Sequence, residues 1–238
     1  MESRADIIEN LCVVIPTLKA GASLDRLLTQ CAGYPVIIAD GGSTDNTINQ
    51  AVRADAVVAS GTAGRGTQLR RGVDWALKTQ NPEWILIIHA DCTLPEDWQG
   101  DVREHINSHP TKAAYFTFGA KASGWRPRFM EFVVKLRDIW PRLPYGDQGL
   151  LISKDMYQSV GGYPDQALFE DVEIIRAIKN TFGKSALRRL SGRIMTDVSA
   201  YERDGFATRT WRNVMIMRDY NRGVSIEDLI KRYRKPAS

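Results

Sequence analysis

A short run of apolar residues in the first half of the chain constrains the fold more than any other feature. Residues 84–88 read Trp-Ile-Leu-Ile-Ile without a polar interruption. Such a run is typical of a strand buried on both faces, as in a parallel sheet covered by helices. His89, Ala90 and Asp91 follow directly, so the pattern places a carboxylate just past the carboxyl end of an internal strand.

Two interpretations of Asp91 are open at this position. Ligands of open α/β sheets bind outside the carboxyl ends of the strands, and an aspartate there can hold a divalent cation against a phosphate, because hard cations take oxygen ligands. The alternative is that Asp91 only caps a turn. Thr93 and Glu96 have the spacing of a capping box, with Pro95 between them, so we expect a helix to begin at Thr93.

Further apolar segments alternate with helical patterns from residue 11 to about residue 118. The predicted strands are residues 11–15, 34–39, 56–59, 84–88 and 113–118. This alternation predicts an α/β fold with a doubly wound, mostly parallel sheet flanked by helices. Asp40 ends the second strand, where it either binds a ligand or stabilises a turn. We expect the strands that end in Asp40 and Asp91 to lie side by side, with both carboxylates at one edge of the sheet.

A glycine-rich, basic segment, residues 64–72, opens a helix after the third strand. Backbone N–H groups at such a helix start suit a phosphate, and Arg65, Arg70 and Arg71 add positive charge. The segment is a poor match to the dinucleotide-binding fingerprint, because Leu69 stands where the third glycine belongs and the segment does not follow the first strand.

Beyond residue 119 the pattern changes to loops rich in Pro, Gly, Trp and Arg. We predict loops over residues 124–128 and 140–147, joined by a short helix. Trp125, Trp140 and Tyr145 are suited either to stacking on a sugar ring or to packing as the core of a lid. Glu170 and Asp171 begin a later helix, where acids either cap the helix or serve catalysis.

The last part of the chain is basic. We expect a strand over residues 187–195, a polar turn over 201–205, and helices over 206–220 and 225–233. A basic amphipathic helix can lie on a membrane surface, although packing against the main domain is the more frequent arrangement.

Composition limits the class of protein. The net charge of the 238 residues is only +4, and no zinc-finger spacing or RNA-binding signature is present, so we expect no nucleic-acid partner. The three cysteines, at 12, 31 and 92, form no CxxC pair, which predicts a reducing compartment. The polar start of the chain and the lack of a long apolar run favour a cytoplasmic protein, with peripheral attachment to the inner membrane left open.

Four segments, in this order and spacing, resemble a family 2 glycosyltransferase of the GT-A fold. They are residues 13–18, 38–47, 89–95, and 161–164 taken together with 169–173. Residues 64–68, 145–149 and 201–205 are most similar to a small bacterial subfamily of radical-SAM/selenodomain-associated transferases. The resemblance implies that residues 1–118 bind a nucleotide-diphosphate sugar, that residues 119–204 form the acceptor-binding and catalytic half, and that residues 205–238 form a C-terminal helical extension.

The resemblance also implies the reaction and its residues. A sugar would move from a UDP- or GDP-linked donor to the hydroxyl of an unknown acceptor, with inversion and with Mn²⁺ or Mg²⁺. Asp171 matches the catalytic base, with Glu170 beside it, and Asp91 matches the metal-binding acid of the DxD motif. The implied donor contacts are Pro16, Thr17, Asp40, Gly41, Arg65, Gln68, His89, Ala90 and Asp91. The implied acceptor contacts are Trp125, Trp140, Tyr145, Asp147 and Gln148, and Arg203 is expected to bind the diphosphate.

Two departures from the family pattern keep alternatives open. Lys19 and Ala20 stand where the family usually has Asn-Glu, and His89 replaces the first acid of the DxD motif. One alternative is a nucleotidyltransferase acting on a sugar phosphate, although its phosphate loop would follow the first strand. The other is a catalytically inactive module that binds a nucleotide without turnover.

Overall fold

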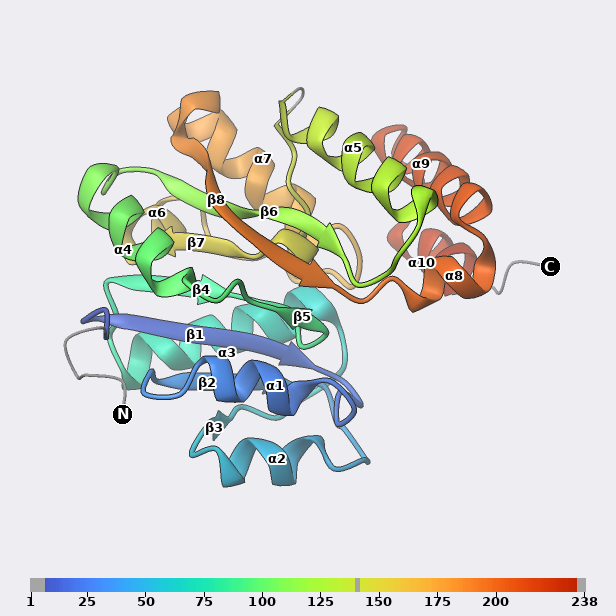
Figure 1. Cartoon of the computed structure of the whole chain (residues 1–238). Coiled ribbons are helices and arrows are strands. Elements are labelled where there is room, and N and C mark those ends of the chain that lie inside the picture. The colour runs from blue at the N-terminus through green and yellow to red at the C-terminus, as the bar shows by residue number, and fades with distance from the viewer. Residues whose placement is uncertain (1–6, 140–141, 235–238) are drawn as a thin grey trace.

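A computed structural model describes residues 7–139 and 142–234, which form one mixed sheet covered by helices (Figure 1). The sheet order is β3-β2-β1-β4-β7-β6-β8-β5, and β1 pairs in parallel with both β2 and β4. The strands are β1 Leu11–Thr17, β2 Val36–Asp40, β3 Val57–Val58, β4 Trp84–Ile87, β5 Cys92–Thr93, β6 Ala113–Ala120, β7 Leu150–Ser153 and β8 Leu187–Thr196.

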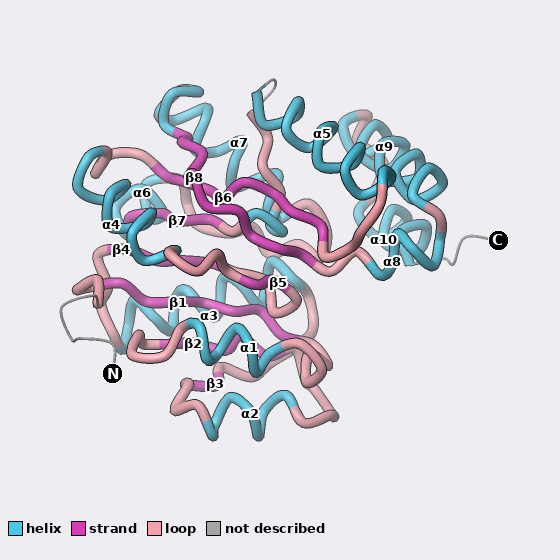
Figure 2. Tube along the Cα trace, viewed as in Figure 1, coloured by secondary structure: helices cyan, strands magenta, loops and turns pink. Residues whose placement is uncertain are grey.

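Helices cover both faces of the sheet, as the cyan segments around the magenta strands show (Figure 2). The helices are α1 Leu24–Gln30, α2 Thr47–Arg53, α3 Arg65–Thr79, α4 Trp98–Ser108, α5 Trp125–Ile139, α6 Lys154–Ser159, α7 Glu170–Phe182, α8 Ser199–Asp204, α9 Phe206–Asn221 and α10 Ile226–Arg234. Two short 3₁₀ turns are η2 Gly146–Gln148 and η3 Lys184–Ala186.

The two main cores follow from the period of two along the strands. In β1, Val13 and Ile15 point into the core that α1, α2 and α4 cover, whereas Cys12 and Val14 point into the core under α3, α6 and α7. The apolar runs without polar interruption therefore mark strands with helices on both sides, as predicted from the sequence.

The order of the strands confirms the α/β class and corrects one expectation. The strands that end in Asp40 and Asp91 do not lie side by side, because β1 lies between β2 and β4. Beyond β4 the sheet becomes mixed, since β7 pairs antiparallel with both β4 and β6. This antiparallel strand brings the turn η2, which precedes β7, to the carboxyl end of β4.

Three local predictions are wrong. The helix expected at Thr93 begins at Trp98, because Cys92 and Thr93 pair with Thr196 and Met195 of β8 as strand β5. The loop expected over residues 124–128 is largely helical, since α5 begins at Trp125. Residues 201–204 belong to α8 rather than to a turn.

The C-terminal helices pack on the second half of the sheet domain. Ile216 of α9 and Leu229 of α10 are buried against Leu168, with Phe169 and Tyr220 beside them. The predicted helical C-terminal extension is thus confirmed for the described residues. No helix within residues 7–139 and 142–234 is both long and apolar enough to cross a membrane.

Candidate active site

The loops after β1 and β2 form one hydrogen-bonded unit around Asp40. Thr17 pairs with Asp40 in the sheet, and its hydroxyl donates to Asp40 Oδ1 at 2.9 Å. The Asp40 carboxylate also accepts from the N–H groups of Gly42 and Ser43 and from the Ser43 hydroxyl. Burial alone would raise the pKa of Asp40, but these hydrogen bonds outweigh it and lower the pKa. Asp40 therefore stays ionised and shapes the loop.

Gln68 and Arg71 of α3 donate hydrogen bonds to the backbone of these loops. The buried Gln68 amide donates to the carbonyls of Thr17 and Ala39 at 2.8 and 2.9 Å. Arg71 donates to the Asp40 carbonyl at 2.6 Å. A Cβ atom on Gly41 would lie 2.9 Å from the Gln68 amide, which explains why glycine follows Asp40. Gln68, a predicted donor contact, is thus committed to the loop backbone in this structure.

The glycine-rich segment places Arg65 at the start of α3, next to the helix start of α7. A Cβ atom on Gly66 would lie only 2.3 Å from the Pro164 carbonyl, so glycine permits the close approach of the two segments. Arg65 Nε lies 3.5 Å from Glu170 Oε1, and Glu170 is fully buried. Two predicted site residues, far apart in sequence, therefore meet.

The carboxyl end of β4 presents His89 and Asp91, both half-buried. Burial, aided by the positive charge of Arg65, lowers the pKa of His89 to about 3, so its imidazole is neutral. Burial raises the pKa of Asp91, while the charges of Arg65 and Lys121 offset part of this shift. Lys121 Nζ also donates to the Asp91 carbonyl at 2.7 Å. His89 thus cannot replace the missing negative charge of the DxD motif, but it can accept or donate one hydrogen bond.

The turn η2 joins His89 to Asp171. Gly146 N–H donates to Asp171 Oδ2 at 2.8 Å. A Cβ atom on Gly146 would lie 2.5 Å from His89 Nε2 and 3.5 Å from Asp171 Oδ2, so the turn needs glycine between the two side chains. The structure therefore brings His89, Gly146 and Asp171 into one site.

Acidic side chains crowd this side of the site. Burial, together with the charges of Asp171, Asp91 and Asp138, raises the pKa of Asp147 to about 6, against the opposing effect of Arg137. Burial and the neighbouring Asp171 likewise raise the pKa of Glu170. Asp147 Oδ1 is buried without a hydrogen-bond partner. Raised carboxyl pKa values in a cleft are a physical signature of functional sites.

Phe169, which precedes α7, adopts a left-handed backbone conformation with φ of 64°. For a residue with a side chain this conformation costs about 1–2 kcal/mol, and it persists where packing enforces it. The Phe169 ring stacks on Tyr220 of α9, with ring centroids 4.4 Å apart. The C-terminal helices therefore hold the turn that places Glu170 and Asp171.

The predicted acceptor residues do not all lie together. Three of them lie in or beside η2, namely Tyr145, Asp147 and Gln148. The Arg137 guanidinium carbon lies over the Tyr145 ring, 3.6 Å from the centre of that ring. Trp125 lies on α5, where its side chain is 73% exposed. Trp140 falls outside the described residues. A stacking role of these aromatic residues on a sugar stays a prediction.

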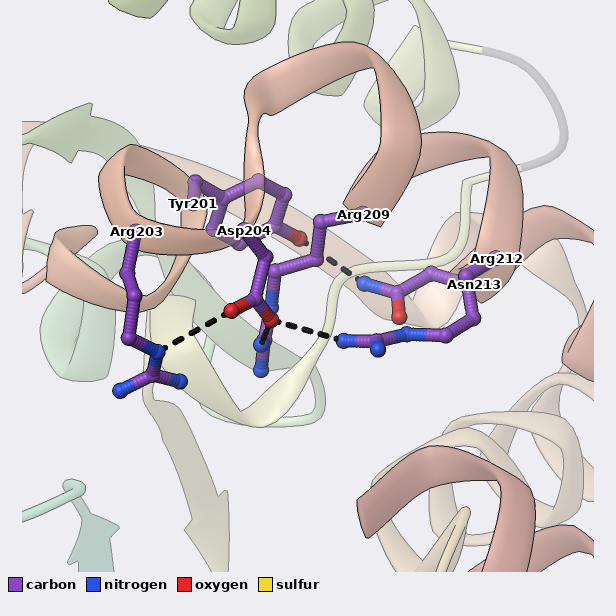
Figure 3. Close-up of polar contacts among 6 residues, drawn as sticks. All are labelled: Tyr201, Arg203, Asp204, Arg209, Arg212 and Asn213. Carbon is purple, nitrogen blue, oxygen red and sulfur yellow. Dashed lines mark hydrogen bonds and ion pairs between the residues drawn. The ribbon is translucent and has the colours of Figure 1, made fainter. Parts of the chain in front are cut away.

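Arg203 belongs to a cluster of arginines around Asp204 (Figure 3). Arg203, Arg209 and Arg212 pair with the Asp204 carboxylate at 3.0, 2.6 and 3.0 Å. Their hydrogen bonds lower the pKa of Asp204 to about 2. Arg203 is 73% exposed and held by its neighbour, so its predicted diphosphate contact remains untested.

Sequence reasoning missed several residues that shape the site. Lys121 reaches Asp91, and Arg137 donates to Gln148 Oε1 at 2.7 Å. The guanidinium of Arg209 lies over the rings of Tyr201 and Tyr233, at 5.3 and 5.9 Å. The only sequence signal for these residues is a basic side chain within an otherwise helical or loop segment, and that signal is common on protein surfaces.

The residues present fit a divalent cation only in part. Within residues 7–139 and 142–234, no group of three or more His, Cys, Asp or Glu side chains is arranged to hold a metal ion. Asp91 supplies carboxylate oxygens of the kind that Mn²⁺ and Mg²⁺ prefer, and the unsatisfied Asp147 Oδ1 lies in the same acidic group. These residues fit a cation that also takes oxygens from a bound diphosphate.

Solved structures of other proteins share this fold. The structure of glucosyl-3-phosphoglycerate synthase from Mycobacterium tuberculosis, in complex with Mn²⁺, UDP and glucosyl-3-phosphoglycerate, is 16% identical, with a TM-score of 0.57 over 79% of this chain and 70% of that chain. TarS 1–349 from S. aureus is 15% identical, with a TM-score of 0.61 over 87% of this chain and 63% of that chain. TarS in complex with UDP gives 16% identity and a TM-score of 0.60. At this identity the likeness shows a shared fold.

Sequence comparison settles the family. No curated protein matches the chain. The family described as "Glycosyl transferase family 2" matches residues 12–169, which run from the second residue of β1 to beyond β7 and include both loops around Asp40 and Asp91. This match covers more than half of the 238 residues. The chain belongs to glycosyl transferase family 2.

Proposed function

We propose that the protein is an inverting glycosyltransferase that moves a sugar from a UDP-linked donor to an acceptor hydroxyl. The observation that carries this proposal is the meeting of Asp171 with Gly146 and His89 at the carboxyl end of β4. Family membership and the structural relatives that hold UDP with Mn²⁺ or Mg²⁺ support a nucleotide-sugar donor, and UDP is favoured over GDP for that reason.

In the proposed reaction, Asp171 is the general base. Its carboxylate accepts the proton of the acceptor hydroxyl while the acceptor oxygen attacks the anomeric carbon in line, and the bond from that carbon to the diphosphate oxygen breaks. Gly146 N–H holds Asp171 Oδ2 in place for this step. Attack on the face opposite to the leaving group inverts the configuration.

The donor side would place the leaving diphosphate between Arg65 and Asp91. Arg65, at the start of α3, supplies positive charge next to a helix N-terminus, a combination that favours phosphate groups. Asp91 would hold Mn²⁺ or Mg²⁺ together with diphosphate oxygens, and a bound cation would offset the charge that develops on the leaving group. Neutral His89 can hydrogen-bond the donor without repelling it.

Calorimetric titration tests the donor assignment. UDP and GDP are titrated, each with Mn²⁺, Mg²⁺ or EDTA, into the wild type, into Asp91→Ala and into the exposed control Asp25→Ala. We expect cation-dependent binding of UDP that Asp91→Ala abolishes and Asp25→Ala retains. Preferred binding of GDP would correct the base, and the absence of nucleotide binding to folded protein would contradict the proposal.

A catalytically inactive module that binds a nucleotide remains the second candidate, because His89 and Lys19-Ala20 depart from the family pattern. Nucleotide binding without donor hydrolysis or transfer under any cation would favour it. Pyrophosphate release from a nucleoside triphosphate and a sugar phosphate would instead favour a nucleotidyltransferase. A cytoplasmic location and membership of the radical-SAM-associated subfamily also stay proposals, which rest on sequence alone.

A further inference from the structure

Helix α5 turns an apolar face away from the protein. Its exposed apolar side chains are Trp125, Phe129, Phe132, Val133, Leu136 and Ile139, with exposed fractions from 40% to 73%. At about 100° per residue, these six positions fall within an arc of roughly 120°. Pro127, Val134 and Asp138 on the opposite side are buried. The six exposed residues are called the α5 face below.

The edges of the α5 face carry positive charge. At the same helical spacing, Arg126 lies along one edge, whereas Arg128 and Lys135 lie along the other, and all three are exposed. The two acids of α5 add little negative charge to this surface. The Glu131 side chain is 11% exposed and is paired with Arg128 and Arg193, and Asp138 is buried, so among the described residues Arg126 and Lys135 supply the unpaired positive charge at the two edges.

We propose that the α5 face docks on a lipid bilayer that contains anionic headgroups. An amphipathic helix with Trp, Phe and Leu on one face and basic residues beside them lies in the headgroup region, where the apolar side chains enter the acyl boundary and the basic ones meet phosphate groups. A twofold contact with a second copy fits less well, because both edges are basic and like charges would then face each other. This surface differs from the basic C-terminal helices that the sequence suggested.

The position of α5 ties this surface to the site. Ahead of the helix, Lys121 contacts the Asp91 carbonyl, and near its end Arg137 donates to Gln148 in the turn that holds Asp171. A docked α5 would therefore hold the candidate active site close to the bilayer surface. The proposal rests on the exposed face and its charges and not on sugar transfer, so it stands or fails independently of the proposed function.

Vesicle sedimentation tests the apolar part of the proposal. The full chain is mixed with phosphatidylglycerol–phosphatidylcholine vesicles or with phosphatidylcholine vesicles alone. We expect binding to the anionic vesicles, and a reduction of roughly tenfold or more in the double variant Phe129→Ser/Leu136→Ser. The matched control, Val52→Ser/Phe182→Ser, changes two exposed apolar residues on α2 and α7 and should bind as the wild type does. Circular dichroism and thermal unfolding verify that each variant folds.

Two further measurements address charge and depth. Arg126→Glu/Lys135→Glu should bind the anionic vesicles more weakly than the wild type does. This loss should exceed the loss that added salt causes in the control variant Val52→Ser/Phe182→Ser. Brominated lipids should quench the tryptophan fluorescence of the wild type more than that of Trp125→Phe.

Any of three results would overturn the membrane proposal. The first is a wild type that does not sediment with anionic vesicles, and the second is a Phe129→Ser/Leu136→Ser variant that sediments equally well. The third is a dimer in light scattering that this variant alone dissociates, since it would assign the α5 face to a second copy.

Discussion

The two sides of the candidate site differ in how their buried polar groups are satisfied. Around Asp40, called the donor side below because we propose that it contacts the donor, the carboxylate accepts hydrogen bonds from Thr17, Gly42 and Ser43, and its pKa is lowered. Around Asp147, Glu170 and Asp171, called the acid side below, burial raises the pKa values of Asp147 and Glu170, and Asp147 Oδ1 has no hydrogen-bond partner. The buried carboxylate on the donor side is fully hydrogen-bonded within the protein, whereas the acid side has buried carboxyl groups that a bound cation or ligand could still contact.

The difference has a physical consequence. A satisfied buried network contributes to folding, whereas buried acids without full compensation cost stability and persist where function requires them. We therefore expect substitutions on the donor side to lower stability and substitutions on the acid side to lower activity. Four experiments test this contrast, beginning with the largest expected effect.

Asp171→Asn should lower the rate of sugar transfer by roughly 10²–10⁴-fold, because an amide cannot accept the acceptor proton. UDP affinity and the free energy of unfolding should change little. The rate is measured with radiolabelled donor once an acceptor is known, and as donor hydrolysis before that. Glu173→Gln, in the same first turn of α7, is the control. Full activity of Asp171→Asn would show that Asp171 is not the general base and would contradict a catalytic role for the acid side.

Gln68→Ala should lower the free energy of unfolding by about 2–3 kcal/mol, because the buried carbonyls of Thr17 and Ala39 lose their donor. Urea unfolding followed by circular dichroism measures the change. Gln158→Ala, at an exposed position, should leave stability within about 0.5 kcal/mol of the wild type. Equal stability of the two variants would show that the loops after β1 and β2 do not need the Gln68 hydrogen bonds to fold.

Gly146→Ala should reduce turnover by roughly 10–100-fold, since the new Cβ would lie 2.5 Å from His89 Nε2, so that either His89 or the turn that holds Asp171 must shift. We expect a smaller loss of stability than in Gln68→Ala. Comparing kcat with the affinity for UDP separates a shifted base from a damaged donor site. A variant that loses stability but keeps turnover would reverse the contrast between the two sides.

The pH dependence of stability should differ in sign between Asp147 and Asp40. The pKa of Asp147 rises from its ordinary value of 3.8 to about 6 in the folded protein. Its contribution to stability is thus fully present below about pH 4 and is lost as the pH rises through 6. Asp147→Asn should flatten this decline and be more stable than the wild type at pH 7, by about 1–2 kcal/mol.

The lowered pKa of Asp40 has the opposite effect, since its contribution is present above pH 3.8 and is lost as the pH falls below that value. Urea titrations from below pH 3.8 to about pH 8, on the wild type and Asp147→Asn, cover both effects. If the free energy of unfolding of the wild type does not decline between pH 4 and 6, burial does not raise the pKa of Asp147.

Local pattern predicted the elements of the first half well. The apolar runs before Asp40 and Asp91 are strands β2 and β4, and Glu170 and Asp171 begin α7 as expected. It failed where pairing at long range decided the conformation. Thr93 did not start a helix because β8, about a hundred residues later in the chain, claims Cys92 and Thr93 as a strand.

The sequence by itself determined the fold class, the family and the positions of the acids at strand and helix ends, since these depend on local periodicity and short motifs. Only the tertiary structure decided that β1 separates β2 from β4, that the antiparallel β7 carries Gly146 to Asp171, and that α5 leaves its apolar side outside. The physical reason is that a period of two or 3.6 residues identifies a buried face but not its partner. The partner of each buried face is determined by contacts between segments far apart in the chain.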